Sequence, residues 1–139
     1  MKKGEFNEQA FSSAIEKIRS RHDRLTVTIP SSGSYLSGEE PVRAPDLIFE
    51  DIGTGKRWVV ELKASGTATL SPSVFPQLLS YRKVFGDAPK TEIVLLTNST
   101  VPEFVSEQLR RLKVKIVTAD DQNEFVQKLE EIIEEEEQG

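Results

Sequence analysis

Residues 45–63 read PDLIFEDIGTGKRWVVELK, and this stretch predicts a β-hairpin. Apolar residues alternate or cluster in 45–51 and again in 57–64, which favours two strands. The residues between them, 52–56 (IGTGK), hold two glycines and are typical of a turn. A turn centred on Gly53-Thr54 would place Asp46 directly opposite Glu61, and cross-strand neighbours of this kind have Cβ atoms about 5 Å apart.

The second strand of this hairpin carries charged side chains where an apolar pattern is expected. Side chains alternate along a strand, so Glu61 and Lys63 share one face and Val60 and Leu62 take the other. Asp46 and Glu61 would repel each other unless a proton or a cation lay between them. A divalent ion fits better than a shared proton, because Mg²⁺ prefers one or two carboxylates together with waters and substrate phosphate.

Lys63 adds a positive charge to the same face. It would orient an attacking water or stabilise charge that develops at a phosphorus centre. The alternative is a plain surface ion pair between Glu61 and Lys63 on an exposed hairpin.

A helix is predicted from about Ser73 to Phe85. Gln77 and Tyr81 are four residues apart and therefore project from the same face of it. A neutral amide and a phenol hold a phosphate or a metal-bound water without adding charge. Arg82 and Lys83 follow and are expected to neutralise backbone phosphates. The alternative is a half-buried tyrosine that packs on the sheet with the glutamine at its rim.

These motifs resemble a known family. Pro45-Asp46, a hairpin and then Glu61-Leu62-Lys63 look like the PD-(D/E)xK nuclease superfamily. Gln77 and Tyr81, in FPQLLSYRK, resemble the QxxxY helix of RecB-like nucleases. The run VVELKASGTATLSPSVFPQLLSY is similar to the C-terminal nuclease domain of the NucS/EndoMS proteins, and the whole resemblance covers about residues 8–118.

The resemblance implies a metal-dependent phosphodiesterase with a restriction-endonuclease-like α/β fold, in which helices flank a central mixed β-sheet. Asp46 and Glu61 would be metal ligands, the backbone carbonyl of Leu62 would complete the coordination, and Lys63 would be the catalytic lysine. Gln77 and Tyr81 join the expected catalytic set, and the implied cofactor is Mg²⁺ or Mn²⁺.

Glu8 is a further candidate metal ligand. Many members of this superfamily carry a glutamate on the first helix that reaches the metal, and Glu8 lies on the apolar stripe that also holds Phe11 and Ile15, where an unpaired acid is costly. The alternative for Glu8 is a favourable interaction with the helix dipole.

The rest of the chain predicts one nuclease domain over residues 1–139. Two polar loops flank the hairpin, and long loops in a compact domain are often functional. Tyr35 in the first loop would stack on a base, and Thr67 in the second would donate to a phosphate. The further predicted elements are a helix over 5–21, a strand over 24–29, loops over 30–43 and 65–72, a strand over 92–97, a helix over 102–112, a strand over 113–118 and an acidic C-terminal helix at about 120–137.

Composition excludes several classes of protein. The 139 residues include no cysteine, which excludes disulfides, zinc–thiolate sites and iron–sulfur clusters, and the single histidine, His22, excludes a site that needs two imidazoles. No apolar run approaches the ~20 residues of a membrane helix, and no secretory signal is evident, so we expect a cytoplasmic protein. The net charge of −5 is uneven, because residues 120–139 hold nine acids and one base while the rest of the chain is mildly basic.

The function expected from the sequence is cleavage of DNA by a metal-activated water. A structure-specific or nonspecific endonuclease is favoured over a restriction enzyme, because no separate base-reading element is visible. The alternative is a catalytically silent subunit with a nuclease fold that binds nucleic acid or a protein partner. The expected partners are DNA and, for a domain this small, a second copy or a larger assembly. The sequence does not decide whether the substrate is DNA or RNA, whether the protein is an endonuclease or an exonuclease, or whether a partner activates it.

Overall fold

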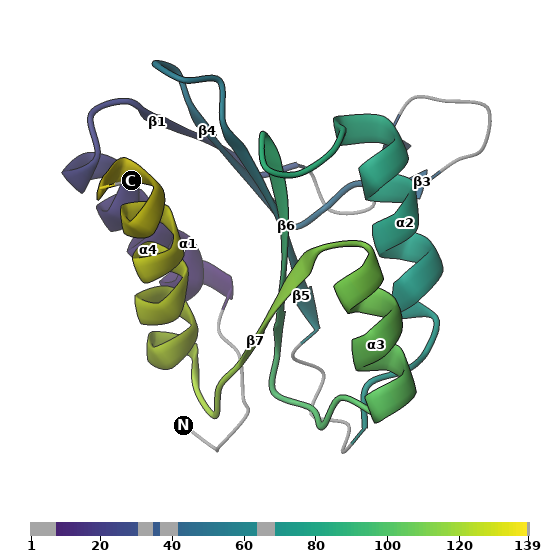
Figure 1. Cartoon of the computed structure of the whole chain (residues 1–139). Helices are drawn as coiled ribbons and strands as arrows, with labels where there is room; N and C mark the ends of the chain where they lie inside the picture. The colour runs from purple at the N-terminus through teal and green to yellow at the C-terminus, as the bar shows by residue number, and fades with distance from the viewer. Residues whose placement is uncertain (1–7, 31–34, 37–41, 64–68, 139) are drawn as a thin grey trace.

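The computed structural model describes residues 8–30, 35–36, 42–63 and 69–138, and Figure 1 shows their arrangement. Its elements are α1 (Glu8–Arg21), β1 (Leu25–Thr28), β2 (Tyr35–Leu36), β3 (Val42–Arg43), β4 (Leu47–Asp51), β5 (Arg57–Lys63), α2 (Val74–Phe85), β6 (Thr91–Thr97), α3 (Glu103–Arg111), β7 (Val114–Thr118) and α4 (Gln122–Gln138). The α/β architecture expected for a restriction-endonuclease-like fold, a central mixed sheet flanked by helices, is confirmed. No helix in the described part of the chain is long and apolar enough to cross a membrane.

The main sheet has the strand order β1-β4-β5-β6-β7. The first three strands are antiparallel, whereas β5, β6 and β7 run parallel. The hairpin register agrees with the prediction, since Leu47 pairs with Val60 and Phe49 pairs with Trp58. The next pair outward in this register is Asp46 and Glu61. All seven residues of β6 are buried, as expected for a parallel strand covered on both faces.

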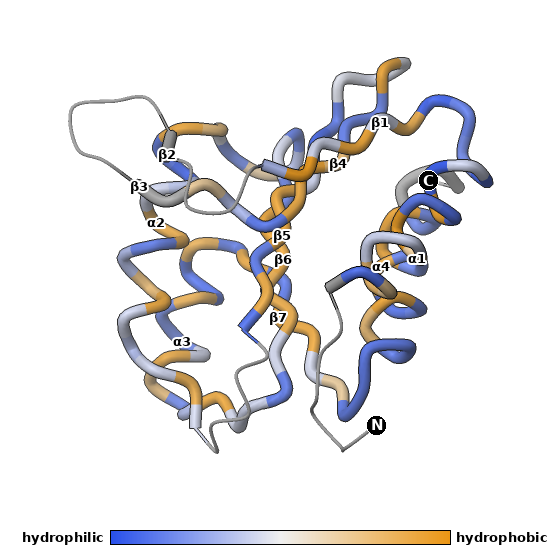
Figure 2. Tube along the Cα trace, turned by 180° about the vertical axis from the view of Figure 1, so that it is seen from behind, coloured by the Kyte–Doolittle hydropathy of each residue, from blue (hydrophilic) through white to orange (hydrophobic). Residues whose placement is uncertain are grey.

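Two helix pairs cover the two faces of the sheet. Figure 1 shows α1 and α4 together on one face and α2 and α3 on the other. The first face holds an apolar cluster of α1, α4 and sheet residues, among them Ile15, Trp58 and Leu129. The second face holds a separate cluster that includes Leu78 and Leu109. In Figure 2 the apolar residues of α1 and α4 are turned toward the sheet, which is the pattern of amphipathic helices.

The predicted elements recur with small shifts at their ends. The segment 30–43, predicted as a loop, contains the short antiparallel pair β2–β3, in which Tyr35 pairs with Arg43. Residues 31–34 and 37–41 lie outside the described residues, as do 5–7 of the predicted first helix and 64–68 of the second loop. After the second loop, Thr69 forms an isolated parallel bridge with Thr100, outside the named strands.

Arg82 joins several segments on the α2/α3 face. Its guanidinium donates to four backbone carbonyls, and the residue is only 8% exposed. The acceptors are the carbonyl oxygens of Leu112, Gly86, Thr91 and Lys113. Burial lowers the pKa of Arg82, and the carboxylates of Glu92 and Asp87 oppose that change. This arginine therefore links the end of α2 to the starts of β6 and β7.

Replacing Arg82 by methionine should destabilise the protein, because buried carbonyls would lose their donor. We expect Arg82→Met to lower the free energy of unfolding by about 2–4 kcal/mol. The control is Lys83→Met, at an exposed position on the same helix, which should change it by less than about 0.5 kcal/mol. Urea denaturation checks both values, and equal midpoints for the two variants would show that Arg82 has no structural role.

Candidate active site

The hairpin brings Asp46 next to Glu61. Asp46 lies one residue before β4, and its Oδ2 accepts a hydrogen bond of 2.8 Å from the backbone N–H of Leu62 on β5. The two strands are joined by a five-residue turn, and the carboxylate of Asp51, the last residue of β4, accepts hydrogen bonds from the backbone N–H groups of Gly53 and Thr54 in it. This turn fixes the register, and the register fixes the distance between the two carboxylates.

Glu61 is buried at 4% exposure, and three side chains hold its carboxylate. Gln77 Nε2 donates to Glu61 Oε2 at 2.6 Å, and the Tyr81 hydroxyl donates to Glu61 Oε1 at 3.2 Å. Lys63 Nζ lies 3.1 Å from Glu61 Oε2. Gln77 Nε2 also donates to the Tyr81 hydroxyl at 2.9 Å. The structure thus brings together the predicted residues Asp46, Glu61, Lys63, Gln77 and Tyr81.

The electrostatics of this group follow from burial. The pKa of Glu61 is raised to about 7, chiefly by burial and also by the nearby Asp46 carboxylate, while Lys63 opposes both effects. The pKa of Tyr81 is raised as well, first by burial and then by the charge of Glu61, so its phenol keeps its proton and remains a donor. The site therefore concentrates two acids and one ammonium ion at the end of β5.

The residues present fit a hard divalent cation. Two carboxylates from neighbouring strands supply oxygen donors, which Mg²⁺ and Mn²⁺ prefer over nitrogen or sulfur. A cation between Asp46 and Glu61 would remove the repulsion that raises the pKa of Glu61. One or two carboxylates are the usual protein ligands of Mg²⁺, the remaining positions being taken by water and phosphate.

The structure places the other predicted residues as follows. Lys83 is exposed on α2. Arg82 was predicted to contact phosphate, but its guanidinium is buried and donates to backbone carbonyl oxygens. We therefore no longer assign Arg82 to phosphate binding. The side chains of Glu8 and Tyr35, and the whole of Thr67, lie outside the described residues.

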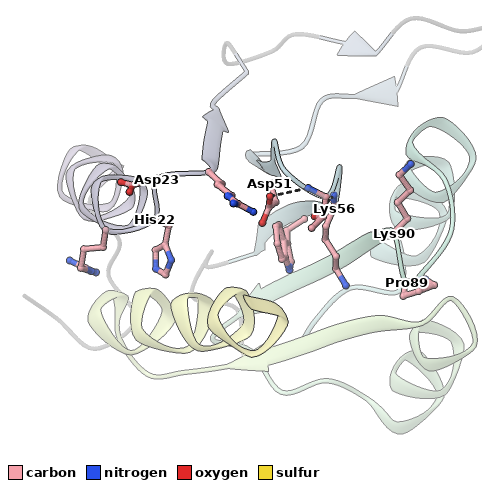
Figure 3. A pocket seen from close by; sticks show the side chains of 10 residues that line it. His22, Asp23, Asp51, Lys56, Pro89 and Lys90 are labelled. Atoms are coloured by element: carbon pink, nitrogen blue, oxygen red, sulfur yellow. Dashed lines mark hydrogen bonds between the residues drawn. The ribbon is translucent and has the colours of Figure 1, made fainter. Parts of the chain in front are cut away.

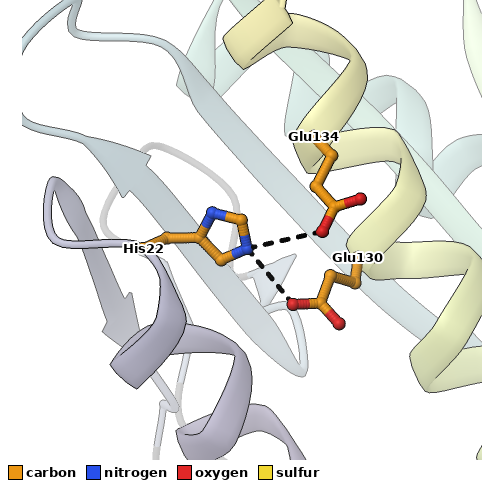
Figure 4. A group of neighbouring side chains, drawn as sticks. All are labelled: His22, Glu130 and Glu134. Atoms are coloured by element: carbon orange, nitrogen blue, oxygen red, sulfur yellow. Dashed lines mark hydrogen bonds and ion pairs between the residues drawn. The ribbon is translucent and has the colours of Figure 1, made fainter.

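A second group of ionisable side chains lies on the other face of the sheet (Figure 4). His22 Nε2 is 3.2 Å from Glu130 Oε2 and 4.0 Å from Glu134 Oε1. Arg21 donates to both oxygens of Glu130 at 2.9 and 2.6 Å, and this contact lowers the pKa of Glu130. Imidazole and carboxylate are donors that bind divalent ions, but here the contacts link the end of α1 to α4.

From the sequence, His22 was noted only as the single histidine, and its contact with α4 was not predicted. The available signal was the four-residue spacing of Glu130 and Glu134, which puts both carboxylates on one helical face. Nothing in the sequence indicated that α1 would lie against that face.

Comparison with known proteins supports the fold. Protein VC1899 from Vibrio cholerae superposes with a TM-score of 0.63 at 14% sequence identity, over 91% of this chain and 36% of that one. A repair endonuclease from Pyrococcus abyssi gives a TM-score of 0.44 at 17% identity, over 84% of this chain and 48% of that one. No family model matches the chain, and no curated protein matches it in sequence. The chain shares the α/β fold of part of VC1899 and spans about a third of that protein's length.

The raised pKa of Glu61 predicts how stability depends on pH in EDTA. The carboxyl has an ordinary pKa of 4.5 when unfolded and about 7 when folded, so the folded chain retains a proton that the unfolded chain releases. This contribution is complete below pH 4.5 and is lost as the pH rises through 7. We expect Glu61 to account for a fall of about 3 kcal/mol in the free energy of unfolding between pH 4.5 and 8.

The variant Glu61→Gln should lose this part of the pH dependence, and the exposed-site control Glu107→Gln should keep it. Urea denaturation at several pH values measures the difference. If the free energy of unfolding depended on pH equally in Glu61→Gln and in the unchanged protein, the raised pKa of Glu61 would not be the cause of that dependence.

Proposed function

We propose that this protein is a Mg²⁺- or Mn²⁺-dependent nuclease that hydrolyses phosphodiester bonds of DNA by attack of an activated water. The observation that carries the proposal is the convergence of Asp46, Glu61 and Lys63 at one end of the hairpin, supported by two residues of α2. We favour a structure-specific or nonspecific endonuclease. The resemblance to the PD-(D/E)xK superfamily supports the same conclusion, since the residues that carry it are the ones that lie together here.

Each residue has a separate task in this mechanism. Asp46 and Glu61, with the Leu62 carbonyl, would hold the cation, and Glu8 is a further candidate ligand. When bound, the cation supplies positive charge to the phosphoryl oxygens and makes a water more acidic. Lys63 is half exposed beside Glu61, where its ammonium would stabilise the negative charge that builds up on the phosphate.

Gln77 and Tyr81 act through Glu61 as positioning residues. Their two hydrogen bonds take one oxygen each of the Glu61 carboxylate and fix its orientation. Groups that support a metal ligand in this way set its geometry and basicity. Lys83, which is exposed, remains a proposed contact to the nucleic acid, and so do Tyr35 and Thr67.

Cleavage of circular DNA tests the nuclease directly. We expect supercoiled and single-stranded circles to be cut with Mn²⁺ or Mg²⁺ and to remain intact in EDTA. Glu61→Ala and Lys63→Ala should each reduce the rate by at least about 100-fold, because the first removes a ligand of the cation and the second removes the positive charge beside the phosphate. Glu107→Ala and Lys17→Ala, at exposed positions, are the matched controls and should cut normally.

Two results would contradict this assignment. Cleavage that survives in folded Glu61→Ala and Lys63→Ala would show that the activity belongs to other residues. An absence of cutting together with an absence of Mn²⁺ binding by calorimetry would favour the silent binding subunit instead.

Tyr81→Phe separates positioning from catalysis. The variant keeps the buried ring and removes one hydrogen bond to Glu61, so we expect the protein to stay folded and Mn²⁺ affinity to fall by about 10-fold or more. Ser80→Ala, next to it on α2, is the control. Unchanged Mn²⁺ affinity in Tyr81→Phe, measured by calorimetry, would rule out the positioning role.

A further inference from the structure

His22 follows the last residue of α1, and its imidazole is directed toward α4 (Figure 3). The backbone is held on both sides, because the His22 N–H donates to the Arg19 carbonyl and the Leu25 N–H donates to the His22 carbonyl. The residue is only 8% exposed. The imidazole therefore has a fixed place between α1 and α4, on the face of the sheet opposite to Glu61, which faces α2.

Two carboxylates of α4 converge on one nitrogen of this imidazole. Glu130 and Glu134 are four residues apart and share one face of the helix. His22 Nε2 is 3.2 Å from Glu130 Oε2 and 4.0 Å from Glu134 Oε1 (Figure 4). One ligand atom of each of the three side chains lies within 4.8 Å of the other two. A single N–H proton makes a well-aligned hydrogen bond to one acceptor, whereas a metal ion would contact all three atoms.

These separations fit a zinc ion. Zn²⁺ binds imidazole nitrogen and carboxylate oxygen at about 2.0–2.2 Å in a tetrahedral arrangement, so its ligand atoms lie about 3.3–3.6 Å apart. The distance from His22 to Glu130 is close to this range, and the Glu134 oxygen would move inward by about half an ångström. The Glu134 side chain is 47% exposed, which leaves room for this movement. An imidazole ligand favours Zn²⁺ over Mg²⁺, which prefers oxygen.

Arg21 holds the Glu130 carboxylate in position. Its Nε and Nη2 donate to Oε2 and Oε1 of Glu130 at 2.9 and 2.6 Å. Hydrogen bonds of this kind orient carboxylate ligands in metal sites. The same contact lowers the pKa of Glu130 and keeps it in the ionised form that binds metal. The Arg21 side chain is 52% exposed, so water screens its own charge.

The charge of α4 favours a cation at this place. Its sequence, QNEFVQKLEEIIEEEEQ, holds seven glutamates and one lysine. The negative charge of the helix thus exceeds what Arg21 and Lys128 neutralise, and such a field raises the local concentration of cations.

A route for the ion is present as well. His22 and Arg21 line a pocket of about 580 Å³ at this end of the molecule (Figure 3). A water molecule takes about 30 Å³, so the pocket has room for a hydrated ion and for the water that commonly fills the fourth position of a zinc site with three protein ligands.

We propose that His22, Glu130 and Glu134 form a Zn²⁺ site that fastens the end of α1 to α4. The ion would take the place of the proton that lies between His22 Nε2 and Glu130 Oε2. The contacts that link the two helices would then also be the ligand set. The site lies across the sheet from the candidate active site, so the proposal does not depend on nuclease activity.

His22 is the only histidine in the chain, so imidazole NMR signals report directly on this site. Protein without a polyhistidine tag, labelled with ¹⁵N-histidine, is titrated with zinc chloride in excess Mg²⁺, which occupies sites made of oxygen ligands alone. We expect the Nε2 signal to shift and to saturate at one equivalent of Zn²⁺. Calorimetry under the same conditions should give a dissociation constant of about 10 μM or tighter.

Variants with a matched change of charge test the ligands. Glu134→Gln should weaken Zn²⁺ binding by at least about 10-fold, since even the loss of a group that only supports a ligand costs this much. Glu131→Gln removes the same charge at an exposed position of α4 and should change the affinity by less than about 2-fold. His22→Gln should abolish binding, and circular dichroism verifies that each variant is folded. Glu134→Gln keeps the test decisive if His22→Gln does not fold.

Zn²⁺ should also stabilise the fold, because the ligands come together only in the folded chain. At free Zn²⁺ of about 100 times the dissociation constant we expect Tm to rise by about 5 °C or more, and Glu134→Gln should lose this rise. Three results would overturn the proposal: an Nε2 signal that Zn²⁺ leaves unchanged, a shift at Nδ1 in its place, or equal affinity in folded Glu134→Gln and Glu131→Gln. Each of them would leave a metal-free ion pair between α1 and α4.

Discussion

The register of the β4–β5 hairpin is the constraint on which the candidate active site depends. Leu47 pairs with Val60, and this pairing sets Asp46 beside Glu61, where the Leu62 N–H donates to the Asp46 carboxylate. A slip by one residue would turn every side chain of β5 to the other face. Glu61 and Lys63 would then point into the α1/α4 core, and Trp58 would leave it. The same register therefore determines both the α1/α4 core and the candidate active site.

Burying Glu61 is costly, and the surrounding structure offsets that cost in three ways. Gln77 and Tyr81 donate hydrogen bonds, Lys63 supplies an opposite charge, and a raised pKa lets the carboxyl hold a proton near neutral pH. A buried carboxylate of this kind needs partners to remain in place. Since α2 supplies two of them, the packing of α2 on the sheet is part of the site as well as of the fold.

The hairpin, and the side chains that lie together at its end, could be predicted from the sequence because both rest on local patterns. Alternation along β5 and the glycine turn determined which residues share a face, and the four-residue spacing of Gln77 and Tyr81 determined their common direction on α2. Arg82 could not be placed in the same way. Next to Lys83 it has the sequence context of a surface cation, and its partners lie 30 and 31 residues further along the chain at Leu112 and Lys113. The contact of His22 with Glu130 on α4 could not be predicted either, because it depends on how α1 and α4 pack together.

Strand β5 has a further consequence for how the protein tolerates change. Its side chains alternate between two separate apolar clusters, with Trp58 and Val60 in one and Val59 in the other, while Glu61 continues the second face into the site. Neighbouring positions of β5 therefore have different roles: some side chains pack in an apolar cluster, and others belong to the candidate active site. Substitutions at Trp58 or Val60 would act on abundance in the cell through loss of folded protein. Substitutions at Glu61 or Lys63 would act on the proposed nuclease activity. Along the seven residues of β5, the expected effect of a substitution would therefore alternate from one position to the next, as the side chains alternate between the two faces of the sheet.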